Sequence, residues 1–302
     1  MSLIERAAKR LEELRRAGYD APDDLQPNSP EARNRPAMQT VEAAMQAAAA
    51  HVAPPAPVSR SRRVDLDLEK LAANGFVTPD MPRSRIADEF RVLKRPLLAN
   101  AGGKRGVHIR HGNLIMVTSA VPGEGKSFCA VNLALSIAME LDRTVLLVDA
   151  DVARPSLPKV LGLPDGKGLL DVLQSDSTEI GDVMLRTSVD KLSILPSGTP
   201  HPQATELLAS ETMSRLLADM EARYADRIII FDSPPLLVTT ESRVLATQMG
   251  QIVFVVHAES TLQSEVKRAL ATIETCPLKM VVLNQARTAA QGAYGYGYGY
   301  GY

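Results

Sequence analysis

The chain has 302 residues with 34 basic and 35 acidic side chains, a formal net charge of −1 and an apolar fraction of 45%. This length supports a large α/β core, and a charge near zero argues against a general nucleic-acid binder, so we expect no nucleic-acid partner. No apolar run approaches the ~20 residues of a membrane span, and the N-terminus has no signal-type apolar segment, which predicts a cytoplasmic protein.

The first 82 residues predict an extension rather than a domain. Residues 1–18 favour an amphipathic helix, because Ser2 and Glu5 have capping-box spacing and apolar residues recur from Ile4 to Leu14. That apolar stripe either packs on its own domain or docks onto a partner. Residues 19–82 predict a mostly disordered linker, because the stretch from Tyr19 to about Ser61 is rich in Pro, Ala, Asn and Gln and has few aliphatic residues.

A helix is predicted over residues 86–97, at the start of the folded domain. Apolar residues from Ile86 to Leu97 form one side, and Asp88, Arg91 and Lys94 follow beside them at three-residue steps. The regular charges suit either a salt-bridged subunit interface or an exposed helix face.

Residues 114–140 predict a nucleotide phosphate site. An apolar strand over 114–117 runs into a glycine loop ending in Gly125-Lys126-Ser127, and a helix is predicted over 128–140. Loop N–H groups and the helix N-terminus then converge on an anion, with Lys126 on the β- and γ-phosphates and the Ser127 hydroxyl on Mg²⁺. The usual phosphate-loop spacing has glycine where Ala120 stands, but the later glycines still allow close backbone approach. The predicted nucleotide contacts of the loop are Pro122, Gly123, Glu124, Gly125, Lys126, Ser127 and Phe128. Cys129 is expected to pack as a small apolar residue.

From residue 114 onward, apolar strands alternate with helical segments. This pattern predicts an α/β fold: a doubly wound, mostly parallel sheet with helices on both faces, of the P-loop NTPase type, over residues 83–288. Further strands are expected at 144–148, 192–195, 227–231, 252–256 and 280–283, and helices at 169–174, 204–224, 242–249 and 262–275.

Carboxylates follow two of these strands where the phosphate loop also points. Asp149 and Asp151 end one strand and Asp232 ends another. Such an aspartate is often only a helix cap, but beside a phosphate loop it also supplies the oxygen ligands that Mg²⁺ prefers. We assign Ser127, Asp149 and Asp232 to the metal, and Lys126, Asp149, Asp151 and Asp232 to catalysis, with the first acidic pair in a base-type role.

Two polar residues have less decided roles. Arg154 follows the acidic pair. We expect it either to pair with a phosphate oxygen or a nearby carboxylate, or to be an ordinary solvent-exposed surface arginine. Asn284 closes the last strand, where its amide suits either an adenine edge or a structural cap. Both are included among the cofactor-binding candidates.

Residues 289–302 form a tail in which tyrosine alternates with glycine. Glycine at alternate positions works against a stable local fold, so we expect disorder. A flexible chain from 285 to 302 has a typical span of about 23 Å, which reaches a neighbouring subunit's site. The tail suits either phosphate acceptors or a self-associating low-complexity segment. The candidate acceptors are Tyr294, Tyr296, Tyr298, Tyr300 and Tyr302.

Taken together, the loop, the two acidic strand ends and the tail resemble the bacterial tyrosine autokinases that regulate polysaccharide synthesis and export. The sequence Val-Ala-Arg-Pro that follows Asp151 most resembles that of autokinases from exosortase-type exopolysaccharide systems. The resemblance implies ATP and Mg²⁺ as cofactors and trans-phosphorylation of the tail within a ring-like homo-oligomer. It also implies activation by the cytoplasmic segment of a membrane chain-length-determinant protein, a tyrosine phosphatase partner, and a place at the inner face of the membrane.

Two departures from the family pattern concern arginines. The family's interface helix usually reads Glu-x-x-Arg-x-x-Arg, where this chain has Asp88, Arg91 and Lys94, and lysine lacks the bidentate geometry of arginine. Ala153 stands where an arginine is often expected after the acidic pair.

Other function classes remain open at this point. The main alternative is a positioning or partition ATPase of the deviant Walker type without kinase activity. Those proteins carry a lysine early in the loop, where this chain has Val121. A non-catalytic scaffold is a third class, against which the intact Lys126 and the three acids argue.

Overall fold

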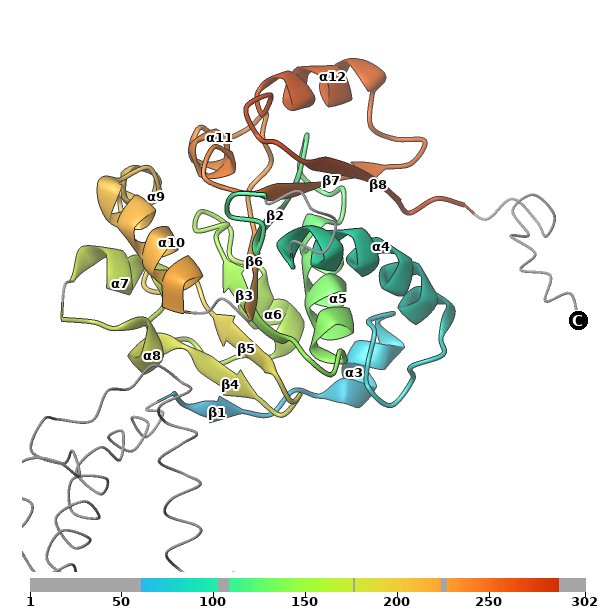
Figure 1. The fold of residues 1–302 in the computed structure, drawn as a ribbon, viewed down its shortest axis with the longest axis horizontal. Helices are drawn as coiled ribbons and strands as arrows, with labels where there is room; N and C mark the ends of the chain where they lie inside the picture. Colours follow the sequence, from blue (N-terminus) through green and yellow to red (C-terminus); the bar gives the residue numbers. More distant parts are fainter. Residues whose placement is uncertain (1–60, 103–108, 176, 224–226, 288–302) are drawn as a thin grey trace, which may run out of the picture. The chain divides into compact units, whose positions relative to one another are not determined.

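The computed structural model describes residues 61–102, 109–175, 177–223 and 227–287 and, within them, one eight-stranded sheet (Figure 1). Its neighbours are parallel except for β4 and β5, which are antiparallel. In spatial order the strands are β1 (Arg63–Val64), β4 (Leu185–Thr187), β5 (Leu192–Leu195), β3 (Thr144–Asp149), β6 (Arg227–Asp232), β2 (Leu114–Ser119), β7 (Gln251–His257) and β8 (Lys279–Asn284).

The central strands are buried on both faces, which explains why their sequences read as unbroken apolar runs rather than as alternating patterns. In β2, Ile115 and Val117 face one core and Leu114 and Met116 face the other. The predicted doubly wound fold is confirmed.

Helices cover both faces of the sheet. The core that contains Ile115 is closed by α3 (Leu68–Ala73), α4 (Arg85–Ala101), α5 (Lys126–Ala138) and α6 (Leu157–Leu161). The opposite core is closed by α7 (Leu169–Gln174), α8 (Ile180–Val183), α9 (Ala204–Leu208), α10 (Glu211–Arg223), α11 (Glu241–Ala246) and α12 (Gln263–Ala271). Helices α4 and α5 lie side by side (Figure 1). In the described part of the chain, no helix combines the length and the apolar character needed to cross a membrane.

All six predicted strands are confirmed to within two residues at either end. One predicted helix, over 204–224, is wrong: it is two helices, α9 and α10. The Ser210 hydroxyl bonds the carbonyl of Leu207 at 2.7 Å and accepts from the N–H of Met213 at 3.2 Å. Because this serine serves the end of one helix and the start of the next, the chain turns there.

The predicted linker is also wrong over residues 61–82, which belong to the folded domain. Asp67 caps α3 by accepting from the N–H of Lys70 at 2.9 Å. Beyond the helix, Val77 is fully buried, and its N–H donates to the side chain of Asn132 in α5 at 2.6 Å. Leu66 and Leu71 are also buried in the core, and Val64 and Leu68 pack against it. The predicted N-terminal helix over 1–18, the linker over 19–60 and the tail over 289–302 lie outside the described residues.

Lys94 does not lie on an exposed charged face, which was one of the two alternatives considered for the helix over 86–97. Its side chain is 5% exposed, and Nζ lies 2.6 Å from a carboxylate oxygen of Glu140 and 2.5 Å from the carbonyl oxygen of Ser136. Arg91 and Asp88 pair with each other on the exposed side. Lys94 therefore fastens α4 to the end of α5, the helix that begins at the phosphate loop.

Candidate functional site

The phosphate loop joins β2 to α5 at the carboxyl edge of the sheet. Gly123 and Gly125 have φ values of 88° and 89°, in the left-handed region that favours glycine. A Cβ on Gly125 would also lie 2.1 Å from Nδ2 of Asn284. Glycine is thus required at position 125 by backbone conformation and by the closeness of a neighbouring side chain.

Glu124 organises the loop from within. Its carboxylate is buried and accepts from the N–H of Val121 at 2.7 Å, from the hydroxyl of Thr261 and from the N–H of His257 at 3.4 Å. His257 ends β7 and Thr261 lies in the loop before α12, and no sequence motif indicated either contact. The Glu124 side chain therefore holds the loop together, which leaves its backbone N–H for a nucleotide.

Asn284 also binds the loop. Its amide donates to the carbonyl oxygen of Glu124 at 2.9 Å, so the end of β8 is attached to the phosphate loop. Asn284 was expected either to contact an adenine edge or to act as a structural cap, and this hydrogen bond is a structural contact.

The three predicted acids converge beside the loop. Asp149 and Asp232 are register partners on β3 and β6, and Asp151 follows β3. Lys126 Nζ lies 2.8 Å from a carboxylate oxygen of Asp151. The catalytic set predicted from the sequence is therefore brought together at one edge of the sheet.

Ser156 is a site residue that the sequence reasoning missed. Its hydroxyl lies 2.8 Å from the Ser127 hydroxyl and 3.3 Å from a carboxylate oxygen of Asp232. Ser156 stands immediately before α6, a helix that was not predicted from the sequence. Contact with Ser127 and Asp232 depends on how the chain folds back after β3.

Burial raises the pKa of both paired acids, and a neighbouring carboxylate adds to it, Asp232 for Asp149 and Asp151 for Asp232. Burial, then the charge of Asp232, raises the pKa of Asp149 to about 8. Burial raises the pKa of Asp232 to about 6, although the Lys126 ammonium and the Ser127 hydroxyl act in the opposite direction. Burial lowers the pKa of Lys126, but Asp232, Asp151 and Asp149 outweigh it, so the net pKa is raised. The site has more carboxylates than its one lysine can balance.

This donor set fits a magnesium ion accompanying a nucleotide. One buried carboxylate oxygen each of Asp149 and Asp232 has no hydrogen-bond partner among the described residues. Orphaned carboxylate oxygens beside a serine hydroxyl are the chemistry that Mg²⁺ prefers. Within the described ranges no group of three or more His, Cys, Asp or Glu residues is arranged to hold a metal by itself, so phosphate and water oxygens would complete the shell.

The remaining candidates lie around this centre. Arg154 is exposed, and its backbone N–H donates to Asp151 at 3.2 Å. The ring of Phe128 packs against Phe76 at a centroid distance of 5.0 Å, so only its backbone faces the loop. Cys129 is buried as predicted, and burial raises the pKa of its thiol to about 12. The tail tyrosines lie outside the described residues.

Comparison with known proteins places these features in a family. The ParA family model, described as NUBPL iron-transfer P-loop NTPase, matches residues 110–286. Tyrosine-protein kinase YwqD of Bacillus subtilis is 33% identical over 183 residues, covering 60% of this chain and 76% of YwqD. Putative tyrosine-protein kinase CapB of Staphylococcus aureus is 28% identical over 218 residues, covering 71% and 91%.

A solved structure extends the likeness to the fold. The kinase domain of the Escherichia coli tyrosine kinase ETK superposes with a TM-score of 0.60 at 24% identity, covering 77% of this chain and 98% of that domain. At this identity the likeness is one of fold.

Proposed function

The chain belongs to the bacterial tyrosine-protein kinases built on the ParA-type P-loop fold, and from that premise we propose that it transfers the γ-phosphoryl group of ATP to the tyrosines of its own C-terminal tail. The observation that carries the proposal is the convergence of Lys126, Asp151 and the Asp149–Asp232 pair beside a glycine loop. A kinase needs this arrangement because phosphoryl transfer depends on positioning and charge stabilisation.

The phosphate loop, Lys126 and the metal ligands handle the charge of the phosphates in this transfer. The N–H groups of residues 123–128 bind the phosphates, and Lys126 balances the charge that develops on the β- and γ-phosphate oxygens. A magnesium ion held by Ser127, Asp149 and Asp232 would supply further positive charge on those oxygens.

The acceptor chemistry is an in-line displacement. The phenol oxygen forms a bond to the γ-phosphorus, and the bond from that phosphorus to the β,γ-bridging oxygen breaks, leaving ADP. The phenol proton passes to a carboxylate of the Asp149 and Asp151 pair, whose position at the end of β3 faces the loop.

The assembly and its biological setting follow from the family. We propose a ring-like homo-oligomer in which one chain's tail enters the next chain's site, controlled by the cytoplasmic segment of a membrane chain-length-determinant protein. A tyrosine phosphatase would reverse the modification, and the role would be control of exopolysaccharide synthesis and export at the inner face of the membrane. The proposed association with an exosortase-type system rests on the sequence that follows Asp151.

A positioning or partition ATPase is the second candidate, since the ParA model matches the chain. Against it stands Val121, which packs against the core at the place where that class carries a lysine.

The test is mass spectrometry of the purified full chain after incubation with ATP and Mg²⁺. Phosphate should be found on Tyr294 to Tyr302, and Lys126→Met should remove it. ATP turnover without phosphotyrosine would overturn the kinase assignment in favour of the ATPase.

A further inference from the structure

A basic pocket lies at the end of the sheet away from the phosphate loop. It has a volume of about 400 Å³ and opens where β3 and β6 begin, at Thr144 and Arg227. Both strands are six residues long and end at Asp149 and Asp232, so about 17 Å of strand separates the pocket from those carboxylates. A ligand in this pocket is therefore not the nucleotide of the phosphate loop.

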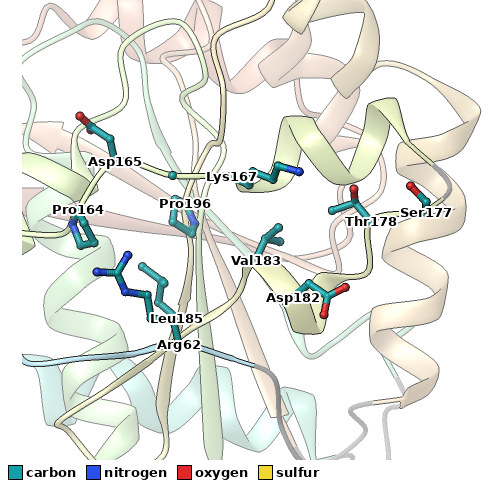
Figure 2. Close-up of a pocket in the computed structure, with 11 residues that line it drawn as sticks. Arg62, Pro164, Asp165, Lys167, Ser177, Thr178, Asp182, Val183, Leu185 and Pro196 are labelled. Atoms are coloured by element: carbon teal, nitrogen blue, oxygen red, sulfur yellow. The ribbon is translucent and has the colours of Figure 1, made fainter.

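Basic side chains dominate the lining of this pocket, which we call the arginine pocket. Its four cations are Arg63, Arg186, Lys191 and Arg227, and among the described residues that line it Asp190 is the one acid. A second cavity, of about 440 Å³, has a different balance: Arg62 and Lys167 are accompanied there by Asp165 and Asp182 (Figure 2). Four cations against one acid leave the arginine pocket positively charged.

Arg63 and Arg186 stand directly opposite each other on β1 and β4. Because neighbouring strands are about 4.8 Å apart, the two guanidinium groups extend side by side from the same face of the sheet. Both side chains are exposed, and neither forms an ion pair within the described part of the chain. Like charges in such a position oppose each other, and an anion between them removes that repulsion.

Hydrogen bonds before and after β1 hold this edge strand in place. The Ser61 hydroxyl donates to the carbonyl oxygen of Gly181 at 3.0 Å. On the other side of the strand, the N–H of Leu66 donates to the Ser188 hydroxyl at 3.0 Å. The strand that carries Arg63 is thus anchored at both ends, so binding does not have to pay for ordering it.

Two further donors line the same pocket. Ser193 on β5 is the register partner of Arg186 and places a half-buried hydroxyl there. Arg227 is half-buried, and its Nε lies 3.4 Å from the Thr144 hydroxyl, which positions a third guanidinium. Lys191 adds charge from a greater distance, because its Nζ already donates to two carbonyl oxygens at the end of α5.

We propose that the arginine pocket binds an anion that carries a diphosphate group, either as a free small molecule or as the head of a lipid. A guanidinium group binds phosphate oxygens through two parallel hydrogen bonds, and Arg63 and Arg186 present two such groups to one space. Because the arginines come from three strands, a ligand with two phosphate groups engages more of them than a single phosphate does. The volume is within the range of ~300–1,000 Å³ typical of ligand pockets.

The test is titration calorimetry of the full-length chain with inorganic diphosphate, after the phosphate loop has been filled with ADP. Arg63→Gln and Arg186→Gln should each weaken binding about tenfold, since each removes a pair of charge-assisted hydrogen bonds. Arg62→Gln is the matched control, because this neighbouring arginine lines the charge-balanced cavity, and it should leave the affinity unchanged. The affinity for ADP, measured separately, should be the same in all three variants, which shows that the fold is intact.

Vesicles distinguish a free ligand from a lipid. The full-length chain is sedimented with phosphatidylcholine vesicles, with and without CDP-diacylglycerol, a lipid that carries a diphosphate. Sedimentation that requires both this lipid and the two arginines identifies a lipid ligand, whereas diphosphate binding without sedimentation identifies a free one, and either result supports the pocket. If neither probe binds in a way that depends on Arg63 and Arg186, or if Arg62→Gln weakens binding as much as the pocket substitutions do, the proposal is overturned.

Discussion

Asp149 and Asp232 lie directly opposite each other at the carboxyl ends of β3 and β6, and both carboxylates are fully buried. Two buried like charges at this spacing oppose each other's ionisation. The pair therefore lowers the stability of the nucleotide-free protein, and it supplies oxygen ligands when a cation binds with the phosphates.

The first prediction concerns the pH dependence of stability. The folded-state pKa of Asp149, about 8, lies above its ordinary value of 3.8, so the folded chain binds the proton more tightly than the unfolded chain. Stability should fall as pH rises from about 4 toward 8. Asp149→Asn should raise the free energy of unfolding at pH 8 by about 2 kcal/mol without nucleotide, and by less at pH 5.

Urea denaturation across this pH range measures the effect, with Asp171→Asn as the contrasting control. Burial of Asp171 raises its pKa, but hydrogen bonds from Thr199 and Gly168 outweigh this and lower it overall. Its carboxylate therefore stabilises the fold above its ordinary pKa, and that substitution should destabilise across the same range. A destabilising Asp149→Asn at pH 8 would contradict the account of the pair.

The second prediction concerns Ser156. Its hydroxyl holds Ser127 Oγ, which must be released to serve a metal ion. Ser156→Ala should lower stability by about 1 kcal/mol but tighten Mg²⁺-ATP binding a few-fold. Titration calorimetry measures the affinity, with Ser175→Ala, a serine bonded to Ser177 on an exposed loop, as the control. Binding weakened more than tenfold would mean that Ser156 itself contacts the ligand.

The third prediction separates the two loop glycines. Gly123→Ala introduces strain from a positive φ alone, about 1 kcal/mol, since no atom lies near its Cβ. Gly125→Ala adds the collision with Asn284 and should weaken ATP binding more than Gly123→Ala does. Combining Gly125→Ala with Asn284→Ala should recover part of that loss in a nucleotide-affinity assay. If the double variant recovered no affinity, the contact with Asn284 would not be the cause of the weaker ATP binding of Gly125→Ala.

The fourth prediction tests the inward position of Lys94. Removing a buried, paired ammonium with Lys94→Met should lower the free energy of unfolding by about 1–3 kcal/mol, because two acceptors lose their donor. Arg91→Met, on the exposed side, should change it by less than about 0.5 kcal/mol. If Lys94→Met instead left stability intact and dissociated an oligomer in sedimentation velocity, Lys94 would be an interface residue.

The sequence predicted the parts of this protein whose signals are local. Unbroken apolar runs marked the central strands, and the glycine loop and strand-end acids marked the site, because parallel strands bring their carboxyl ends together. The sequence could not show Ser156 on Ser127, or Thr261 on Glu124, since those contacts join segments separated by 29 and 137 residues.

The two shortest strands, β1 and β4, could not be predicted because their pairing is also between segments far apart in the sequence. Strand β1 has only two residues and pairs with β4, which is more than a hundred residues away, so neither has a periodic pattern of its own. Lys94 appeared to belong to an exposed charged row because helical spacing does not show whether a long side chain finds buried acceptors.

The most direct test of the central claim measures two products in one sample. Full-length chain is incubated with ATP and Mg²⁺ at concentrations that favour assembly, and ADP and tail phosphotyrosine are quantified together by mass spectrometry. The account predicts one phosphotyrosine on residues 294–302 for each ADP formed until the tail is filled, and neither product with Lys126→Met. ADP accompanied by free phosphate, with the tail unmodified, would contradict it.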